Sequence, residues 1–375
     1  MGNTLVVTND FPPRSGGIQS FVHALTTRLP AGTVTVYAPA WDGAAEFDAR
    51  QPMRVIRHPT SLMLPVPAVR RRAVAALREY DCDNVLFGAA APLGLLAPAL
   101  RKAGAKQLVG LTHGHEAGWA ALPGARGLLH RIGDGVDVLT YLGDYFRVRL
   151  ARGLSAEAAA RMVRLAPGVD ATTFRPGAGG AFVRKRHGLD GRPVVVCVSR
   201  LVPRKGQDTL IRAWPVVLAA APDAMLLLVG DGPYRKDLNT LAERLGVAPS
   251  VRFAGPVPDE ELPAHYDAGD IFAMPCRTRR RGLDVEGLGI VYLEASATGL
   301  PVIGGDSGGA PDAIRHGESG YVVPGHRVSE VAARIIELID DPARARAMGE
   351  NGLAWVEREW RWDLVTDRLS HLLQG

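Results

Sequence analysis

The stretch "TLVVTNDFPPRSGGIQSFVHALTTRL", residues 4–29, predicts a strand, a glycine-containing loop and a helix in direct succession. Residues 4–8 are β-branched or apolar, which favours a buried strand. In residues 18–29, apolar side chains recur at helical spacing from Ile18 to Leu25, so the predicted helix has one apolar face. A strand followed by a helix is the repeating unit of parallel α/β sheets, and this pair therefore predicts the fold class.

The same alternation continues along the chain. Further strands are predicted at residues 33–38, 84–90, 107–113 and 136–142, with helices between them such as 68–80. A Pro- and Gly-rich stretch at 165–180 has no clear period and is interpreted as a linker. Beyond it the alternation resumes, with strands at 193–200, 224–230, 251–255, 271–275 and 301–305 and helices at 206–221, 234–246, 259–269 and 289–299.

These elements predict an α/β protein built from two Rossmann-like, doubly wound domains. A length of 375 residues is typical of two domains. We expect the first domain at residues 1–168 and the second at 169–357, with a C-terminal helix at about 358–375 packing back on the first. Ligands of such sheets bind beyond the carboxyl ends of the strands, so two facing domains would place the active site in a cleft between them.

Composition narrows the environment of the protein. The net charge of +5 and a pI near 9.3 suit an anionic ligand or an acidic membrane surface, although many enzymes share them. Cys82, Cys197 and Cys276 lie far apart, which indicates neither a disulfide framework nor a thiolate metal site. The N-terminus lacks a basic and apolar leader, and no apolar run is long enough to span a bilayer. We expect a reduced, cytoplasmic protein.

Two glycine or basic loops are candidates for binding an anion. Gly16 and Gly17 precede the first helix, where backbone N–H groups can approach a phosphate; a tight turn without a ligand is the alternative. In "SRLVPRKGQD" (199–208), Arg200, Arg204 and Lys205 follow a strand at its ligand-binding end. Cations there can neutralise a diphosphate, and the alternative is a solvated basic loop.

The stretch "GLDVEGLGIVYLEASATG" (282–299) carries two carboxylates. Glu286 lies in a glycine-rich turn, where Gly287 and Gly289 leave N–H groups bare as a helix begins, and such a turn can hold a phosphate or sugar hydroxyls. Glu294 lies eight residues later in an otherwise apolar helix, where a carboxylate is costly unless it is hydrogen bonded. A ribose is a suitable partner for Glu294; a solvated helix face is the alternative.

Two further motifs could be mistaken for metal sites. In "LTHGHEAGW" (111–119), His113, His115 and Glu116 lack the HExxH spacing of zinc enzymes, so His113 either contacts a sugar hydroxyl or is structural. The "DCD" at 81–83 matches the DxD signature of metal-dependent glycosyltransferases, but it precedes a strand and would lie at the edge opposite the ligand. No metal site is predicted.

The stretch "GDSGGAP" (305–311) spells the signature of trypsin-like serine proteases. Such a serine needs an all-β scaffold with a histidine and a buried aspartate beside it, whereas this chain alternates strands and helices. Ser307, Gly308 and Gly309 follow a parallel strand, so we predict a cleft loop near a bound ligand and no nucleophilic role for Ser307.

Together, "VTNDFPPRSGGIQSF", "THGHEAGW", "SRLVPRKGQDTL" and "LDVEGLGIVYLEA" resemble the retaining GT-B glycosyltransferases over essentially the whole chain. The spacing of Glu286 and Glu294 is shared across that wide family, and the other stretches are more restricted. Within that family, these stretches resemble the mannosyltransferases of phosphatidylinositol mannoside synthesis more specifically. It implies transfer of mannose from GDP-mannose to phosphatidylinositol monomannoside through an α-(1→6) linkage, with retention and without a metal or other cofactor.

The resemblance implies catalytic roles for four side chains. His113 would hydrogen bond the transferred mannose, Arg200 and Lys205 would neutralise the diphosphate leaving group, and Glu286 would hold mannose hydroxyls. It further implies a donor-binding set made of Gly16, Gly17, Arg200, Lys205, Phe253, Val257, Glu286, Gly287, Leu288, Gly289, Ile290 and Glu294. Within that set Phe253 and Val257 would lie against the guanine, with Asp259 as a possible partner of the base.

A lipid acceptor implies peripheral contact with the inner face of the plasma membrane. Arg70, Arg71 and Arg72 lie on a predicted amphipathic helix of the first domain, where basic residues attract an anionic leaflet; a solvated helix face is the alternative. The expected partners are thus a nucleotide-sugar donor and a lipid acceptor, and no nucleic acid. The protein itself is expected to be a monomer. The run from Arg279 to Arg281 departs from close relatives, which tend to have small residues there, and it leaves details of the acceptor open.

Three other functions are compatible with parts of the sequence. A related GT-B enzyme could use a UDP-sugar or another acceptor, and the loop that would contact the base does not separate these donors. A serine hydrolase would depend on Ser307, and a non-catalytic scaffold would not need the set His113, Arg200, Lys205, Glu286 and Glu294.

Overall fold

The computed structural model describes residues 2–375 and divides into two compact units. Of the described residues, unit 1 comprises those up to Pro167 together with Asp363–Gly375, and unit 2 comprises Gly168–Trp362. The division between the units falls one residue before the 168/169 boundary drawn from the sequence. The C-terminal segment that joins unit 1 starts at Asp363, where the sequence analysis started it at about 358.

Unit 1 is built on a seven-stranded sheet in the order β3-β2-β1-β4-β5-β6-β7, and each neighbouring pair is parallel. The strands are β1 Asn3–Val7, β2 Val34–Pro39, β3 Arg54–His58, β4 Cys82–Phe87, β5 Gln107–Gly110, β6 Val138–Tyr141 and β7 Val163–Arg164. The helices are α1 Gly17–Arg28, α2 Ala44–Asp48, α3 Pro67–Glu79, α4 Ala97–Lys102, α5 Glu116–Ala121, α6 Pro123–Gly135, α7 Asp144–Ala151, α8 Ala156–Ala160 and α16 Trp362–Leu372.

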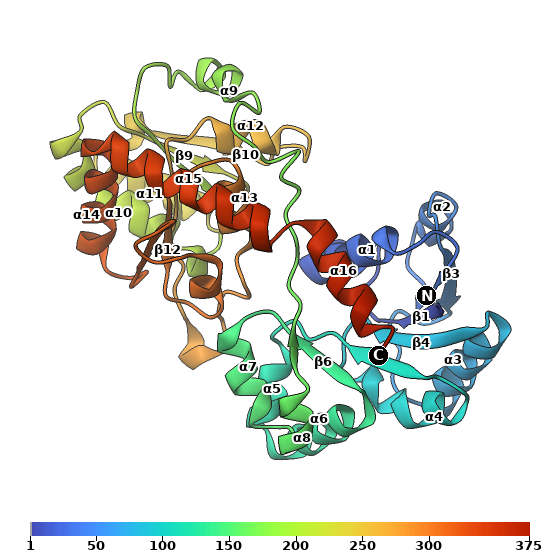
Figure 1. Ribbon diagram of the computed structural model, residues 1–375. Helices are drawn as coiled ribbons and strands as arrows, with labels where there is room; N and C mark the ends of the chain where they lie inside the picture. Colours follow the sequence, from blue (N-terminus) through green and yellow to red (C-terminus); the bar gives the residue numbers. More distant parts are fainter. Residues whose placement is uncertain (1) are drawn as a thin grey trace. The chain divides into compact units, whose positions relative to one another are not determined.

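Helices cover both faces of this sheet (Figure 1). The central strands β1, β4 and β5 are almost entirely buried, and apart from polar residues near their amino ends they are apolar, as expected for parallel strands that are covered on two sides. Leu5, Val85 and Leu108 from these strands pack with Ala73 of α3 and Leu100 of α4 in one core. The burial of both faces explains why these strands could be recognised as continuous apolar runs.

Unit 2 is built on a six-stranded parallel sheet in the order β10-β9-β8-β11-β12-β13. The strands are β8 Val194–Val198, β9 Met225–Val229, β10 Val251–Gly255, β11 Ile271–Met274, β12 Val302–Gly305 and β13 Gly320–Val323. The helices are α9 Gly180–His187, α10 Gln207–Ala220, α11 Arg235–Arg244, α12 Leu262–Asp267, α13 Ile290–Ala297, α14 Val328–Asp340 and α15 Pro342–Glu359. Both sheets thus have the strand order of doubly wound folds.

Three strands were missed from the sequence. Strand β3 lies at an edge of its sheet and carries Arg54, Arg57 and His58, so its composition lacks the apolar run of a central strand. Strand β7 has only two residues. Strand β13 is also an edge strand and is four residues long. Edge position and short length weaken the pattern that identifies a strand in a single sequence.

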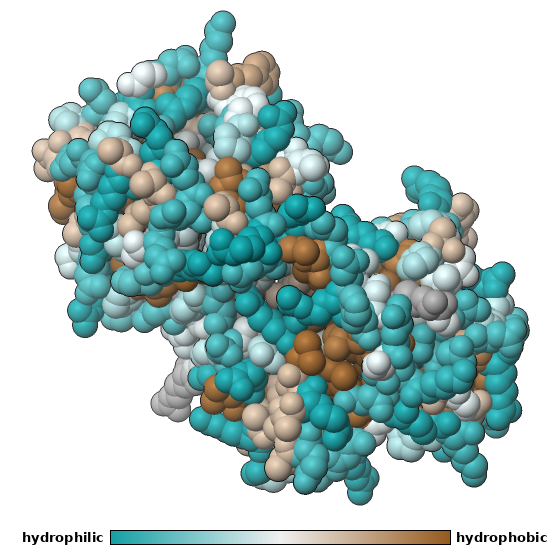
Figure 2. Space-filling view, in the orientation of Figure 1, coloured by the Kyte–Doolittle hydropathy of each residue, from teal (hydrophilic) through white to brown (hydrophobic). Residues whose placement is uncertain are grey.

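The last helix, α16, packs on unit 1. Gln107 at the start of β5 donates a hydrogen bond from Nε2 to the carbonyl of Leu372 at 2.9 Å, and Arg368 reaches the carbonyl of Arg164 at 3.4 Å. On the face drawn in Figure 2, hydrophilic side chains predominate and apolar ones form small separate patches. Within residues 2–375, no helix has both the length and the apolar character that crossing a bilayer requires.

Candidate active site

A buried ion pair lies at the carboxyl edge of the sheet of unit 2. The Lys205 ammonium, just after β8, lies 2.8 Å from Oε2 of Glu286, which precedes α13. Only 11% of the Lys205 side chain and 7% of the Glu286 side chain are exposed. Arg204 approaches the same oxygen at 3.7 Å through Nε and lies 3.3 Å from Asp284 through Nη1. Arg279 lies 3.7 Å from Asp284 as well, so three cations and two carboxylates meet at this edge.

The loop that carries Lys205 packs against the main chain of the segment that follows β11. The short 3-10 helix Pro203–Lys205 ends at Gly206, which has φ +81°, and a side chain there would collide with the carbonyl of Pro275. The main-chain N–H of Arg277 donates to the carbonyl of Arg204 at 2.8 Å. These contacts fix the direction in which the Lys205 side chain leaves the loop.

The stretch 305–311, which resembles a protease signature, holds the main chain of Glu286. Ser307 is fully buried, and its hydroxyl accepts a hydrogen bond from the Glu286 N–H at 3.2 Å. The Gly309 N–H donates to the Glu286 carbonyl at 3.0 Å, and the Ser307 hydroxyl also lies 3.2 Å from Thr278 Oγ1. The described partners of Ser307 include no histidine, so a nucleophilic serine finds no support here. Contact of Ser307, Gly308 and Gly309 with a ligand stays a prediction.

The glycine-rich turn before α13 leaves main-chain donors free. Gly289 has φ +78°, a left-handed conformation that favours glycine, and it begins the helix. Three residues directly before α13 and the first residue of the helix have main-chain N–H groups without a protein partner in the described part of the chain. They are Gly287, Leu288, Gly289 and Ile290. Free N–H groups at a helix N-terminus attract an anion or a negatively polarised oxygen.

Glu294 lies on α13 beyond this turn and is half-buried. Its Oε2 accepts a hydrogen bond from the Tyr266 hydroxyl at 2.6 Å. Burial raises the pKa of Glu294 to about 7, the Tyr266 bond acts in the opposite direction, and the negative charge of Asp259 adds to the rise. This carboxyl group therefore sits near the midpoint of its titration at neutral pH.

The remaining predicted donor-binding residues of unit 2 lie at or near strand ends. Arg200, just after β8, is exposed and has no ion-pair partner within the described residues. Phe253 on β10 is partly exposed, and the Arg235 guanidinium lies 5.5 Å from its ring centre. Val257 is partly exposed and Asp259 is exposed on the loop after β10. The structure thus leaves Arg200 available to a ligand.

In unit 1, Gly16 and Gly17 lie exposed at the start of α1, a helix of 12 residues. Among the described residues, neither amide group has a protein partner. A side chain added at Gly17 would meet no neighbour, whereas one at Gly16 would collide with Gln19. The geometry suits an anion that approaches the main chain at this helix N-terminus.

His113 follows β5 and has a defined tautomer. Its Nε2 lies 2.6 Å from the carbonyl of Gly88, and a carbonyl only accepts, so Nε2 carries the proton. Burial lowers the pKa of His113, which keeps the ring neutral and leaves Nδ1 as an acceptor. The buried Glu116 accepts hydrogen bonds from the main-chain N–H groups of His113 at 2.9 Å and Gly114 at 3.0 Å. Glu116 therefore shapes the turn that presents His113.

The "DCD" stretch lies at the amino end of β4, away from the edge that carries His113. Asp83 forms an ion pair with Lys106 at 3.0 Å. Among residues 2–375, no three His, Cys, Asp or Glu side chains are grouped as metal ligands would be.

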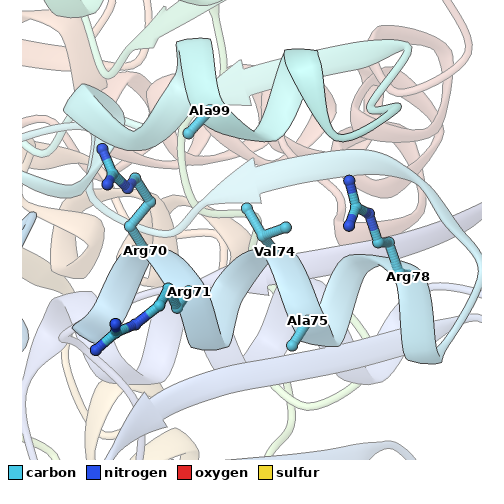
Figure 3. A pocket seen from close by; sticks show the side chains of 6 residues that line it. All are labelled: Arg70, Arg71, Val74, Ala75, Arg78 and Ala99. Carbon is cyan, nitrogen blue, oxygen red and sulfur yellow. The ribbon is translucent and has the colours of Figure 1, made fainter. Parts of the chain in front are cut away.

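The exposed arginines on α3 differ in one member from the patch predicted from the sequence. Arg72 pairs with Glu79 at 3.2 Å, whereas the exposed Arg70, Arg71 and Arg78 line a groove of about 350 Å³. In Figure 3, Arg70 and Arg78 extend toward α4 on either side of Val74. The groove therefore combines guanidinium groups with an apolar floor.

Sequence analysis overlooked several residues that shape these sites. Tyr266 gave no signal, because a buried tyrosine on a short helix is indistinguishable from a core residue before its partner is known. Glu116 was considered only as a metal ligand. Asp284, two residues before Glu286, could have been recognised as a further carboxylate beside the basic loop.

Two protein-family models match the chain. Residues 15–173 match Glycosyltransferase Family 4, and residues 181–355 match Glycosyl transferases group 1. A curated relative from Mycobacterium tuberculosis, a GDP-mannose-dependent alpha-(1-6)-phosphatidylinositol monomannoside mannosyltransferase, is 52% identical over 100% of this chain and 99% of that relative. A GDP-mannose-dependent monoacylated alpha-(1-6)-phosphatidylinositol monomannoside mannosyltransferase from Corynebacterium glutamicum is 46% identical over 99% of this chain and 98% of that relative.

Solved structures share the fold at low identity. The Anabaena protein Alr3699/HepE in complex with UDP has a TM-score of 0.81 and 20% identity, and the match covers 100% of both chains. A glycosyltransferase from Rickettsia africae has a TM-score of 0.79 and 16% identity, covering 100% of this chain and 98% of that chain. These likenesses show the arrangement of two parallel-sheet α/β domains.

Proposed function

Because this chain belongs to the glycosyltransferase family of the GDP-mannose-dependent phosphatidylinositol monomannoside mannosyltransferases, which it matches over its full length, we propose that it acts on the same substrates. The chain is a GT-B glycosyltransferase. The proposed reaction moves mannose from GDP-mannose to phosphatidylinositol monomannoside through an α-(1→6) linkage, with retention of the anomeric configuration.

The observation that carries this proposal is the cluster around Glu286. Lys205 lies within ion-pair distance of Glu286, and the free amide groups of the turn before α13 lie in the residues that follow it. Arg200 adds a free cation after the same strand that leads to Lys205. A diphosphate needs cations and N–H donors, and a hexose needs a carboxylate acceptor. This one edge of unit 2 offers all of these groups.

The nucleoside is assigned to the neighbouring part of the same edge. Glu294 lies within α13, eight residues after Glu286 in the sequence, and presents a carboxyl group suited to the two adjacent hydroxyls of a ribose. Phe253 and Val257 offer partly exposed apolar surface for the base, and Asp259 an acceptor for its N–H groups. This assignment follows the roles that the family resemblance implies.

We assign front-face attack as the mechanism. An acceptor hydroxyl attacks the anomeric carbon from the side of the departing GDP, and its proton passes to the departing β-phosphate oxygen. The bond from the anomeric carbon to that oxygen breaks as the new glycosidic bond forms. Lys205 and Arg200 stabilise the negative charge that develops on the diphosphate, without a metal ion. Glu286 orients the mannose through its hydroxyls.

Unit 1, taken by itself, also has groups suited to binding a nucleotide sugar. Nδ1 of His113 is a neutral acceptor that can bind a mannose hydroxyl, since Nε2 is occupied by Gly88. The free amide groups of Gly16 and Gly17 are suited to a phosphate oxygen.

We also propose peripheral contact between unit 1 and an anionic membrane. Arg70, Arg71 and Arg78 supply cations on α3, each worth about 1 kcal/mol near such a surface. In the loop directly before α3, Leu62 and Leu64 are 56% and 48% exposed, a suitable pair for insertion among lipid headgroups. The three cysteines are buried and unpaired, as in proteins of the reducing cytoplasm, which supports the cytoplasmic face.

Donor selectivity tests the nucleotide assignment. Isothermal titration with GDP-mannose, UDP-glucose and ADP-glucose is expected to show binding of GDP-mannose at least tenfold tighter than of the other two. Preference for the UDP-sugar would overturn the guanine assignment and favour the related enzyme with a different donor.

A further inference from the structure

Tyr266 and Glu294 connect α12 to α13 through a hydrogen bond of 2.6 Å between the phenol and Oε2. Tyr266 is fully buried, and its hydroxyl has a single proton, so this bond uses its whole donor capacity. A carboxylate has two oxygens, and within the described chain Oε1 of Glu294 has no hydrogen-bond partner. One oxygen is therefore fixed by the protein and the other is left to a ligand.

Aromatic packing fixes the position of the Tyr266 hydroxyl. The ring stacks on Phe272 of β11 at 5.7 Å with 28° between the planes, and meets the edge of Phe174 at 5.6 Å and 82°. Phe272 is itself buried in the central part of the sheet. Because the ring is enclosed on two sides, Tyr266 can hold Oε2 without rearrangement when a ligand arrives.

We propose that Tyr266 is a positioning residue for the donor nucleotide: its hydroxyl holds Oε2 of Glu294 so that Oε1 accepts hydrogen bonds from the ribose hydroxyls. This inference rests on the function proposed above. Tyr266 does not touch the nucleotide in this account, and its whole effect passes through Glu294.

The arrangement couples binding to pH. The titratable groups near Glu294 are Tyr266 on α12 and Asp259 on the loop after β10; Cys197 on β8 lies near Tyr266 and remains a thiol, since burial raises its pKa to about 12. Burial and Asp259 favour the neutral carboxyl group, and Tyr266 favours the ionised one. Ribose hydroxyls donate better to a carboxylate, so donor affinity rises with pH through neutrality.

Isothermal titration between pH 6 and 8.5 tests this coupling, with GDP-mannose as the probe. Its diphosphate is esterified at both ends and does not titrate near neutrality, so a pH dependence reports on the protein. For Tyr266→Phe we expect affinity about tenfold weaker at pH 7.5 and a rise that is displaced to higher pH. Tyr292→Phe is the matched control, because that buried hydroxyl bonds the Met274 carbonyl and Cys276 instead.

Each outcome decides the proposal. In Tyr292→Phe, the pH midpoint of the rise in affinity for GDP-mannose should equal that of the unmodified protein. In Glu294→Gln, the affinity should not rise with pH. If Tyr266→Phe binds GDP-mannose with unchanged affinity and midpoint, Tyr266 only packs and the proposal is wrong. If the unmodified protein binds no GDP-mannose at any pH, the donor assignment itself fails. Should Tyr266→Phe not fold, 3-fluorotyrosine at position 266 takes its place, because its more acidic phenol donates more strongly to Oε2 of Glu294. A rise in affinity displaced to lower pH supports the proposal, and an unchanged pH dependence overturns it.

Discussion

Gly308 lies directly against the main chain of Glu286, and a methyl group at its Cα would collide with the Glu286 carbonyl oxygen. The stretch that resembles a protease signature therefore serves a carboxylate on another segment. Its glycines allow the two main chains to approach closely, and Ser307 and Gly309 then hydrogen bond the N–H and C=O groups of Glu286.

Gly308→Ala is expected to displace Glu286 and lower the rate of mannose transfer by at least tenfold. Gly317→Ala is the matched control, because Gly317 is also left-handed, at φ +82° against +58°, but has open space around it. Both variants carry the conformational cost of a left-handed alanine, about 1–2 kcal/mol. Steady-state kinetics on the folded proteins compare them. Equal rates for the two variants would contradict the role of the contact with Glu286.

Lys205→Met removes the nearer of two cations beside the buried Glu286 carboxylate and leaves only Arg204, at 3.7 Å. Breaking a buried ion pair costs about 3–5 kcal/mol, and loss of a charge that stabilises the leaving group lowers kcat about 100-fold or more. Denaturant unfolding and product formation measure the two effects. Lys236→Met, on the exposed face of α11, should change neither.

The double variant Lys205→Met/Glu286→Gln separates stability from catalysis. Because it also removes the buried charge that has lost its nearest partner, it should regain much of the lost stability while remaining inactive. Recovery of transfer together with stability would show that the pair has only a structural role.

Glu294→Gln should change how stability depends on pH. The pKa of Glu294 rises from 4.5 to about 7 on folding, so the folded protein binds the proton more tightly and its stability falls as pH increases through this interval. The glutamine variant lacks this loss, so its free energy of unfolding should rise relative to that of the unmodified protein as the pH increases from 4.5 to 7. Above pH 7 the difference should level off at up to about 3 kcal/mol. Guanidinium unfolding at pH 5, 6, 7 and 8 measures the difference. Parallel curves for the two proteins would refute the raised pKa.

Replacement of Arg70, Arg71 and Arg78 by alanine should weaken sedimentation with anionic vesicles about tenfold or more. The charge-matched control replaces the exposed Arg126, Arg131 and Arg152 of the same unit, and it should bind vesicles nearly as well as the unmodified protein. Equal loss in both triple variants would mean that only net charge matters, and it would contradict a specific contact at α3.

Apart from β3, β7 and β13, the strands of both sheets and the restart of the fold after the linker could be predicted from the sequence. They depend on local periodicity and on rules for parallel sheets, as in Val194–Val198 followed by Gln207–Ala220. Lys205 and Glu286 could be proposed as candidate residues because each lies in a loop after the carboxyl end of a predicted strand.

Pairings between distant segments could not be predicted in the same way. Nothing in the local sequence shows that the Ser307 hydroxyl meets the amide of Glu286, or that Tyr266 meets Glu294. These contacts depend on how neighbouring loops pack, which a single sequence does not record. The pair between Arg72 and Glu79 is different, because both residues lie on α3 and a spacing of seven residues places them on one face of that helix.

Product analysis by mass spectrometry tests the central claim most directly. The protein is incubated with GDP-mannose and phosphatidylinositol monomannoside, beside Glu286→Gln as the inactive variant and Glu243→Gln, exposed on α11, as the matched control. We predict addition of one hexose in an α-(1→6) linkage by the unmodified and Glu243→Gln proteins, and at least a 100-fold loss in Glu286→Gln. Absence of product from GDP-mannose, or near-normal turnover by Glu286→Gln, would contradict the account.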